Sequence, residues 1–138
     1  MSRILPLIPV ALALPVTLAA CLPLAKRVPT GAEDFATYCA ACHGDSGDGK
    51  GVLIGTLNGT PANLTRLAAA NGGKFPMAHV MSKIWDNGGR SDRHVMPEFA
   101  DLFDPDDLVL FDSGDGIQTP TPRRLAQLGE YLQGIQAK

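Results

Sequence analysis

The chain has 138 residues, a formal net charge of −2 and no cluster of basic residues, which argues against a nucleic-acid partner. This length suits one domain. A hydrophobic content of 45 % beside 19 % charged residues indicates a compact globular domain with an apolar leader.

The leader comes first. A single charge, Arg3, precedes an uncharged apolar run over residues 4–25, which is typical of a secretory signal peptide. The run is long enough to cross a membrane as a helix. Its four prolines disfavour that alternative because each removes a helical hydrogen bond (Pro6, Pro9, Pro15 and Pro23). We therefore expect export, with residues 1–20 as the signal peptide.

The stretch LAAC, which ends at Cys21, resembles the lipobox of bacterial lipoproteins. The resemblance implies that Cys21 carries lipid and becomes the mature N-terminus, on the periplasmic side of a bacterial membrane. A chance cysteine near an ordinary cleavage site is the alternative. Residues 21–29 are then the lipidated N-terminus and a short tether, and residues 30–138 form the domain.

The domain begins with helix signals. Over residues 30–43, Thr30 and Glu33 have the spacing of a capping box, and Gly44 ends the predicted helix. The glycine-rich residues 44–61 are predicted to form a flexible surface loop. A short helix is predicted from Asn63 to Gly72.

The second half contains two stronger helix signals. Pro76 opens a predicted helix with an apolar stripe that ends at Gly88. Residues 89–103 form a predicted loop. Two short apolar or β-prone pieces around 113–116 predict a short β-hairpin insert at about 108–118. The last predicted helix has Thr121 as its cap and Pro122 at its first position. The fold class is therefore all-α, apart from the hairpin.

Cys39, Cys42 and His43 form a C-x-x-C-H motif. A redox dithiol would need a βαβ setting, and a structural zinc site usually needs two pairs of ligands. The motif is instead the signature of covalent haem attachment. Two thiols one turn apart can add to the two vinyl groups of a haem, and the adjacent histidine presents a nitrogen to iron. We predict one haem c, attached through Cys39 and Cys42.

The motif does not identify the second axial ligand of the iron. Its candidates are three methionines and two histidines: Met77, Met81, Met96, His79 and His94. Met77 and Met81 lie four residues apart on the apolar stripe, where core packing is their ordinary role. His79 falls off that stripe. Met96 stands in a predicted loop beside Pro97, which restricts the backbone.

The chain resembles the class I c-type cytochromes with one haem. The resemblance lies in CAACHG near the end of a first helix, VMPEF further along and a closing amphipathic helix. The resemblance covers about residues 30–136. It implies a small helical bundle around one covalent haem, in which the first and last helices pack together. It also implies Met96 as the second iron ligand, with His94 as its chief rival. Pro61 is implied as the residue whose carbonyl accepts a hydrogen bond from His43.

Iron with histidine and methionine ligands has both axial positions filled and shuttles one electron. The expected function is that of an electron carrier between membrane or periplasmic redox proteins, without enzymatic activity of its own. Two alternatives are a haem subunit of a larger oxidoreductase and a haem-based sensor with a displaceable second ligand. The expected partners are a redox donor, a redox acceptor and the membrane, through Cys21.

Overall fold

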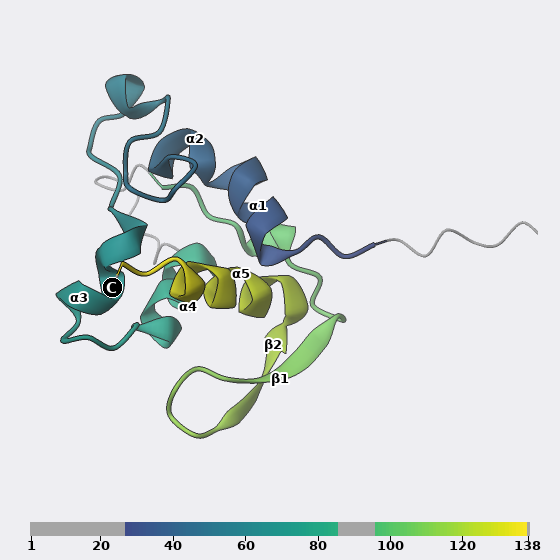
Figure 1. Ribbon diagram of the computed structural model, residues 1–138. Coiled ribbons are helices and arrows are strands. Elements are labelled where there is room, and N and C mark those ends of the chain that lie inside the picture. Colours follow the sequence, from purple (N-terminus) through teal and green to yellow (C-terminus); the bar gives the residue numbers. More distant parts are fainter. Residues whose placement is uncertain (1–26, 86–95, 138) are drawn as a thin grey trace, which may run out of the picture.

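The computed structural model describes residues 27–85 and 96–137 (Figure 1). The predictions of a signal peptide and of lipidation at Cys21 lie outside the described residues, and so does the candidate ligand His94. Within the described part of the chain, no helix has the length and apolar character needed to cross a membrane.

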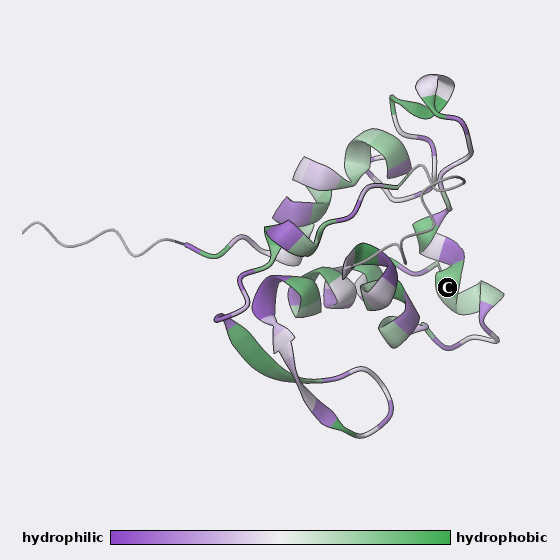
Figure 2. Cartoon of the chain, turned by 180° about the vertical axis from the view of Figure 1, so that it is seen from behind, coloured by the Kyte–Doolittle hydropathy of each residue, from purple (hydrophilic) through white to green (hydrophobic). Residues whose placement is uncertain are grey.

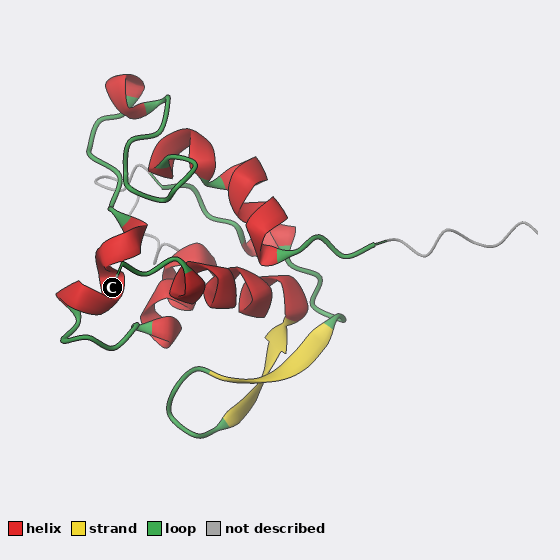
Figure 3. Ribbon diagram, in the orientation of Figure 1, coloured by secondary structure: helices red, strands yellow, loops and turns green. Residues whose placement is uncertain are grey.

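Short helices and one two-stranded antiparallel sheet make up the described chain (Figure 3). The α-helices are α1 (Gly31–Tyr38), α2 (Ala40–His43), α3 (Leu67–Ala70), α4 (Met77–Trp85) and α5 (Arg123–Gly134). Three 3-10 helices are η1 (Ile54–Thr56), η2 (Leu64–Arg66) and η3 (Ala100–Leu102), and the strands are β1 (Leu108–Asp112) and β2 (Gln118–Pro122). The predicted hairpin is confirmed, and the described fold is otherwise helical.

The N-terminus of α1 has the predicted capping box. The Thr30 hydroxyl accepts from the Glu33 amide at 3.3 Å, and the Glu33 carboxylate accepts from the Thr30 amide at 2.8 Å. The helix does not continue evenly to His43, because the backbone of Cys39 departs from helical geometry at φ −116° and separates α1 from α2. Gly44 ends α2 with φ +80°, as predicted.

The glycine-rich segment after α2 is only in part the surface loop that the sequence predicts: residues 52–60 are mostly exposed, whereas the first half packs against α2. Gly47, Gly49 and Gly51 are buried. The amides of Gly49 and Gly51 donate to the carbonyls of His43 at 2.7 Å and Cys42 at 3.2 Å. A Cβ on Gly51 would lie 2.3 Å from the carbonyl oxygen of Ala41. These glycines therefore allow a close approach of two backbones beside the C-x-x-C-H motif.

Helices α1, α4 and α5 supply most of the buried core. Phe35 of α1 and Leu128 of α5 are 1 % and 2 % exposed, and the ring of Phe35 lies 5.2 Å from that of Tyr131. The packing of the first helix on the last is thus confirmed for Phe35. Tyr38, the last residue of α1, is 44 % exposed and its ring contacts that of Phe99. Figure 2 shows hydrophobic and hydrophilic residues alternating along these helices.

The apolar stripe of α4 faces the same core, as predicted. Its buried members are Met77, Val80, Met81 and Ile84. Trp85, at the end of the stripe, is 38 % exposed and stacks on Phe103 at 5.8 Å.

The contact of α1 with α5 gives a first prediction. A Cβ on Gly31 would lie 2.1 Å from the backbone oxygen of Gln127 and 3.0 Å from the Cα of Leu128. These are backbone atoms and cannot move aside without shifting a helix. Gly31→Ala is therefore expected to lower the free energy of unfolding by about 1–3 kcal/mol in chemical denaturation. Gly134→Ala is the matched control, because nothing lies within 4 Å of a Cβ there. An equal loss in both variants would contradict the close crossing.

The β-hairpin leads directly into α5. Leu108 pairs with Pro122 and Leu110 with Pro120. Thr121, predicted to cap α5, lies instead in β2 opposite Val109, and its hydroxyl donates to the Thr119 carbonyl at 3.0 Å. The prediction of Thr121 as a helix cap is therefore wrong. The strand ladder continues up to the first turn of α5, which begins at Arg123.

The turn of the hairpin depends on one carboxylate. Oδ1 of Asp112 accepts from the amides of Gly114, Asp115 and Gly116 at 2.8, 3.1 and 3.0 Å. The Gly114 hydrogen bond, more than any other contact, holds the pKa of Asp112 below its ordinary value. The stability that these hydrogen bonds add to the folded protein is therefore fully present above the ordinary carboxyl pKa, and it is lost as the pH falls through the lowered pKa of Asp112. Amide NMR shifts of Gly114 and Gly116 are expected to change in that acidic range, and to stay flat in Asp112→Asn.

Candidate haem-binding site

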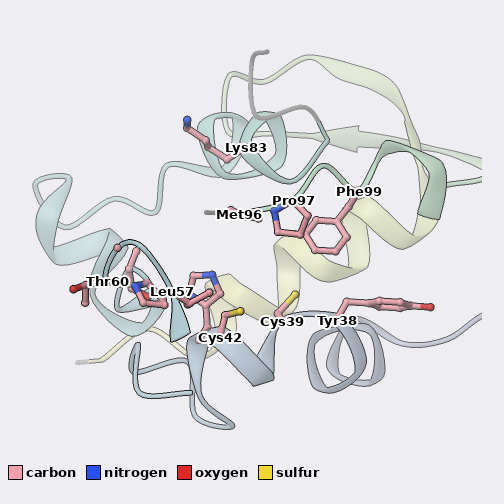
Figure 4. Close-up of a pocket in the computed structure, with 13 residues that line it drawn as sticks. Tyr38, Cys39, Cys42, Leu57, Thr60, Lys83, Met96, Pro97 and Phe99 are labelled. Carbon is pink, nitrogen blue, oxygen red and sulfur yellow. Dashed lines mark hydrogen bonds between the residues drawn. The ribbon is translucent and has the colours of Figure 1, made fainter. Parts of the chain in front are cut away.

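One cavity of about 360 Å³ opens beside α2 (Figure 4), within the size range of small-molecule sites. Its lining includes all the residues that the sequence singled out for haem: Cys39, Cys42, His43, Pro61 and Met96. Figure 4 shows Cys39 and Cys42 on one side, with Met96, Pro97 and Phe99 across from them. The fold thus gathers these residues from segments more than fifty positions apart in the chain.

Cys39 lies at the break between α1 and α2, and Cys42 lies within α2. They are not joined by a disulfide. Burial, with smaller contributions from the charges of Asp34 and Cys42, raises the pKa of Cys39 to about 11. Reactive dithiols have a lowered pKa, because the thiolate is the nucleophile. The raised pKa of Cys39 therefore argues against the redox-dithiol alternative. Among the described residues, no three His, Cys, Asp or Glu side chains form a metal-binding group.

The ring of His43 is held by one hydrogen bond, from Nδ1 to the carbonyl oxygen of Ala62 at 3.0 Å. A carbonyl only accepts, so Nδ1 carries a proton, and in the neutral ring this leaves the lone pair on Nε2. The resemblance implied Pro61 as the acceptor, and the structure corrects this by one residue. The Pro61 carbonyl lies on Gly49 instead, 2.9 Å from where a Cβ on that glycine would be. Pro61 still lines the cavity.

The methionines separate into two groups. Met77 and Met81 are 6 % and 8 % exposed and pack in the core beside Gly129, so the prediction of core packing is confirmed. His79 is exposed and does not line the cavity. Met96 is half-buried, packs on the edge of the core and lines the cavity. Among the described candidates for the second ligand, only Met96 is placed to reach the same space as His43.

Sequence reasoning missed several residues of this cavity. The rings of Tyr38 and Phe99 lie 6.4 Å apart in an edge-on contact, and both line it. Lys83 of α4 lines it as well. Phe99 carried a usable signal, since it is an aromatic residue three positions after Met96. Lys83 carried none, because a charged residue on a helix is ordinarily a solvated one.

A buried ion pair joins Asp34, which lies in α1 just before the C-x-x-C-H motif, to Arg124 of α5. Asp34 is 2 % exposed, and its carboxylate accepts from Nε of Arg124 at 2.9 Å and from Nη2 at 2.5 Å. The remaining Nη1 of Arg124 donates to the carbonyl of Leu102 at 2.9 Å. The hydrogen bonds with Asp34 raise the pKa of Arg124. Arg124 therefore joins α1, α5 and η3.

The donor set around the cavity fits a c-type haem. Two thiols lie one turn apart, an imidazole keeps Nε2 as its free acceptor, and a thioether lies on the other side. Imidazole and thioether are axial ligands of haem iron in cytochromes c. The hydrogen bond to Ala62 has the orienting role that metal-binding histidines need.

The position of Ala62 can be tested through Gly49. Gly49 has φ +85°, and a Cβ there would crowd Pro61 and Ala62. Gly49→Ala is expected to displace the carbonyl of Ala62, weaken its bond to His43 and shift the reduction potential of the holoprotein. Gly73→Ala is the matched control, with φ +89° and nothing within 4 Å of a Cβ. Both variants are expected to lose about 1–2 kcal/mol of stability to backbone strain. A potential that shifts equally in both would contradict this account.

Comparison with known proteins agrees with this site. Residues 26–109 match the family model described as cytochrome C oxidase, cbb3-type, subunit III. Over 28 residues the chain is 61 % identical to the dehydrogenase subunit of an alcohol dehydrogenase (quinone) from Gluconacetobacter polyoxogenes, and equally to that from Komagataeibacter europaeus. Each of these matches covers 20 % of this chain and 4 % of the relative.

The chain thus spans a small part of the length of these curated relatives. No solved structure matches it significantly. The family match covers more than half of the chain and includes both the C-x-x-C-H motif and Met96. The chain belongs to the c-type cytochrome family described as cytochrome c oxidase, cbb3-type, subunit III, which implies a haem and a role in electron transfer.

Proposed function

We propose that this protein is a one-electron carrier with a single haem c, attached through Cys39 and Cys42 and ligated by His43 and Met96. The observation that carries the proposal is the shared cavity, which is lined by both thiols, the imidazole and the thioether. A bound haem supplies an iron centre that cycles between its ferric and ferrous states.

The chain's own residues account for a carrier rather than a catalyst. Ala62 orients His43 through Nδ1, which raises the basicity of the ligating nitrogen. Met96 is a soft thioether, a ligand type that favours ferrous iron and raises the potential. With both axial positions taken by protein, no position is left for a substrate, so we propose no enzymatic activity for this chain alone.

A redox titration with carbon monoxide tests the carrier function. The purified protein is expected to follow a one-electron Nernst curve. Its reduced absorption spectrum is expected to stay unchanged under carbon monoxide, because Met96 occupies the second axial position. Rapid carbon monoxide binding by the reduced wild type would favour the sensor alternative and contradict the proposal.

The proposed place of action is the periplasmic side of a bacterial membrane, with the lipid anchor at Cys21. The support is the leader and its LAAC stretch. Intact-mass measurement of protein extracted from membranes is expected to show a chain that lacks residues 1–20 and carries acyl groups. A mass without acyl groups would contradict the anchor.

A second candidate is a haem subunit of a larger oxidoreductase. It is favoured by the matched family, named after an oxidase subunit, and by the short matches to dehydrogenase subunits. Extraction in mild detergent followed by native electrophoresis separates the two candidates. A subunit is expected to migrate with larger polypeptides, whereas a free carrier migrates as a small protein.

A further inference from the structure

The β-hairpin carries an apolar outer face that is distinct from the haem cavity. Along β1, Val109 and Phe111 are half-buried, whereas Leu108 and Leu110 are 46 % and 70 % exposed. Pro120, opposite Leu110, is exposed, and Ile117 near the turn is 62 % exposed. Leu108, Leu110 and Pro120 share one face by the strand register, and we call these three residues the hairpin patch. Contiguous exposed apolar side chains of this kind mark interaction sites.

The patch lies apart from the site that the family shares. The family match ends at residue 109, so nearly all of the hairpin lies beyond it. No described residue after Phe99 lines the cavity. Figure 1 shows the hairpin on the side of α5 opposite α2, and Figure 2 shows the same arrangement from behind. Holding the haem therefore does not explain why these side chains are exposed.

The hairpin is also anchored at both ends. At its base, Nε of Arg123 donates to the Asp107 carboxylate at 2.9 Å, and the Arg123 amide donates to the Asp107 carbonyl at 2.9 Å. Near its tip, the Lys74 ammonium donates to the Gly114 carbonyl at 3.1 Å. The three amide bonds to Asp112 fix the turn. A pre-ordered surface loses little conformational entropy when it binds.

The charges around the hairpin patch select its occupant. Exposed carboxylates surround it: Asp104, Asp106, Asp112 and Asp115. Among the basic side chains that the structure describes, Lys74 and Arg123 contact the hairpin, where they are bonded to Gly114 and Asp107. A second copy of the chain would bring like charges together, and an anionic lipid surface would repel the same carboxylates. A protein surface with an apolar centre and basic rim complements both features.

We propose that the hairpin patch docks this cytochrome on a partner protein whose contact surface is apolar and bordered by Lys or Arg side chains. Docking there leaves the haem cavity free to meet a second redox protein. The inference rests on the proposed electron-transfer function, because it supplies the attachment that a haem subunit or tethered carrier needs.

Site-specific photo-crosslinking in native membranes tests the partner. A benzophenone amino acid replaces Leu110 in the full-length holoprotein, and in the control it replaces the exposed Ala69 of α3. Position 110 is expected to give one discrete protein adduct, whose crosslinked segment is apolar and flanked by Lys or Arg. An adduct with lipid, an adduct with a second copy, or a yield no higher than at position 69 would overturn the proposal.

Binding to the purified partner then tests the patch. Leu108→Ser with Leu110→Ser is expected to weaken binding at least tenfold, as for hot-spot residues. Val52→Ser, at another exposed apolar residue, is expected to leave binding unchanged. Equal affinity of the wild type and the double variant would refute the docking role. The absorption spectrum and reduction potential of the double variant are expected to match those of the wild type, because the hairpin patch does not line the haem cavity. Failure of the proposed carrier function would instead be seen in the spectrum of the wild type itself.

Discussion

Replacing Arg124 with methionine is expected to lower the free energy of unfolding of the holoprotein by about 3–5 kcal/mol. Asp34 is 2 % exposed, and its carboxylate is held by two nitrogens of Arg124. Without the guanidinium, a charge stays buried with no compensating partner. The carbonyl of Leu102 loses its donor in the same variant. Chemical denaturation of wild type and variant at neutral pH measures the difference.

A double-mutant cycle separates the ion pair from loss of packing. Arg124→Met combined with Asp34→Asn is expected to cost less than Arg124→Met alone, because no unpaired carboxylate is then buried. Simple additivity of the two single changes would show that the pair is not coupled.

Replacing Met96 with alanine is expected to lower the reduction potential by on the order of 0.1 V, within the ~0.8 V span that axial ligands command. Loss of the thioether removes the ligand that favours ferrous iron. The weak long-wavelength charge-transfer band of methionine ligation is expected to disappear from the oxidised spectrum. Reduced Met96→Ala is expected to bind carbon monoxide.

Met81→Ala is the matched control for Met96→Ala. Met81 is 8 % exposed in the core, so its truncation is expected to cost about 2–5 kcal/mol of stability. Its charge-transfer band is expected to remain. A charge-transfer band that survives in Met96→Ala and vanishes in Met81→Ala would identify Met81 of α4, rather than Met96, as the second ligand.

Local signals predicted much of this fold correctly. The capping box at Thr30, the cap at Asn63 and the stripe of α4 each depend on residues within one or two helical turns. The structure has all three, with Asn63 accepting from the amide of Thr65 at 3.0 Å. The hairpin followed in the same way from two short apolar or β-prone segments around a glycine-containing turn. The C-x-x-C-H spacing was enough to locate one side of the cavity.

What the sequence could not predict depends on contacts between distant segments. Asp34 and Arg124 are 90 positions apart, and nothing local distinguishes either from a solvated charge. His43 is bonded to the carbonyl of Ala62, whereas the carbonyl of Pro61 faces Gly49, and no local signal distinguishes these two neighbouring carbonyls. Thr121 is a residue type that often caps helices, but its pairing with Val109 across the hairpin places it in a strand.

Intact-mass spectrometry of the purified protein in denaturant tests whether Cys39 and Cys42 attach one haem in the cavity that His43 and Met96 line. Only a covalently bound haem stays with the unfolded chain. We expect a single species heavier than the processed chain by one haem, and loss of that added mass when both cysteines are replaced by serine. A wild-type chain that carries no haem mass in denaturant, or a double variant that keeps it, would show that the two cysteines do not hold the haem.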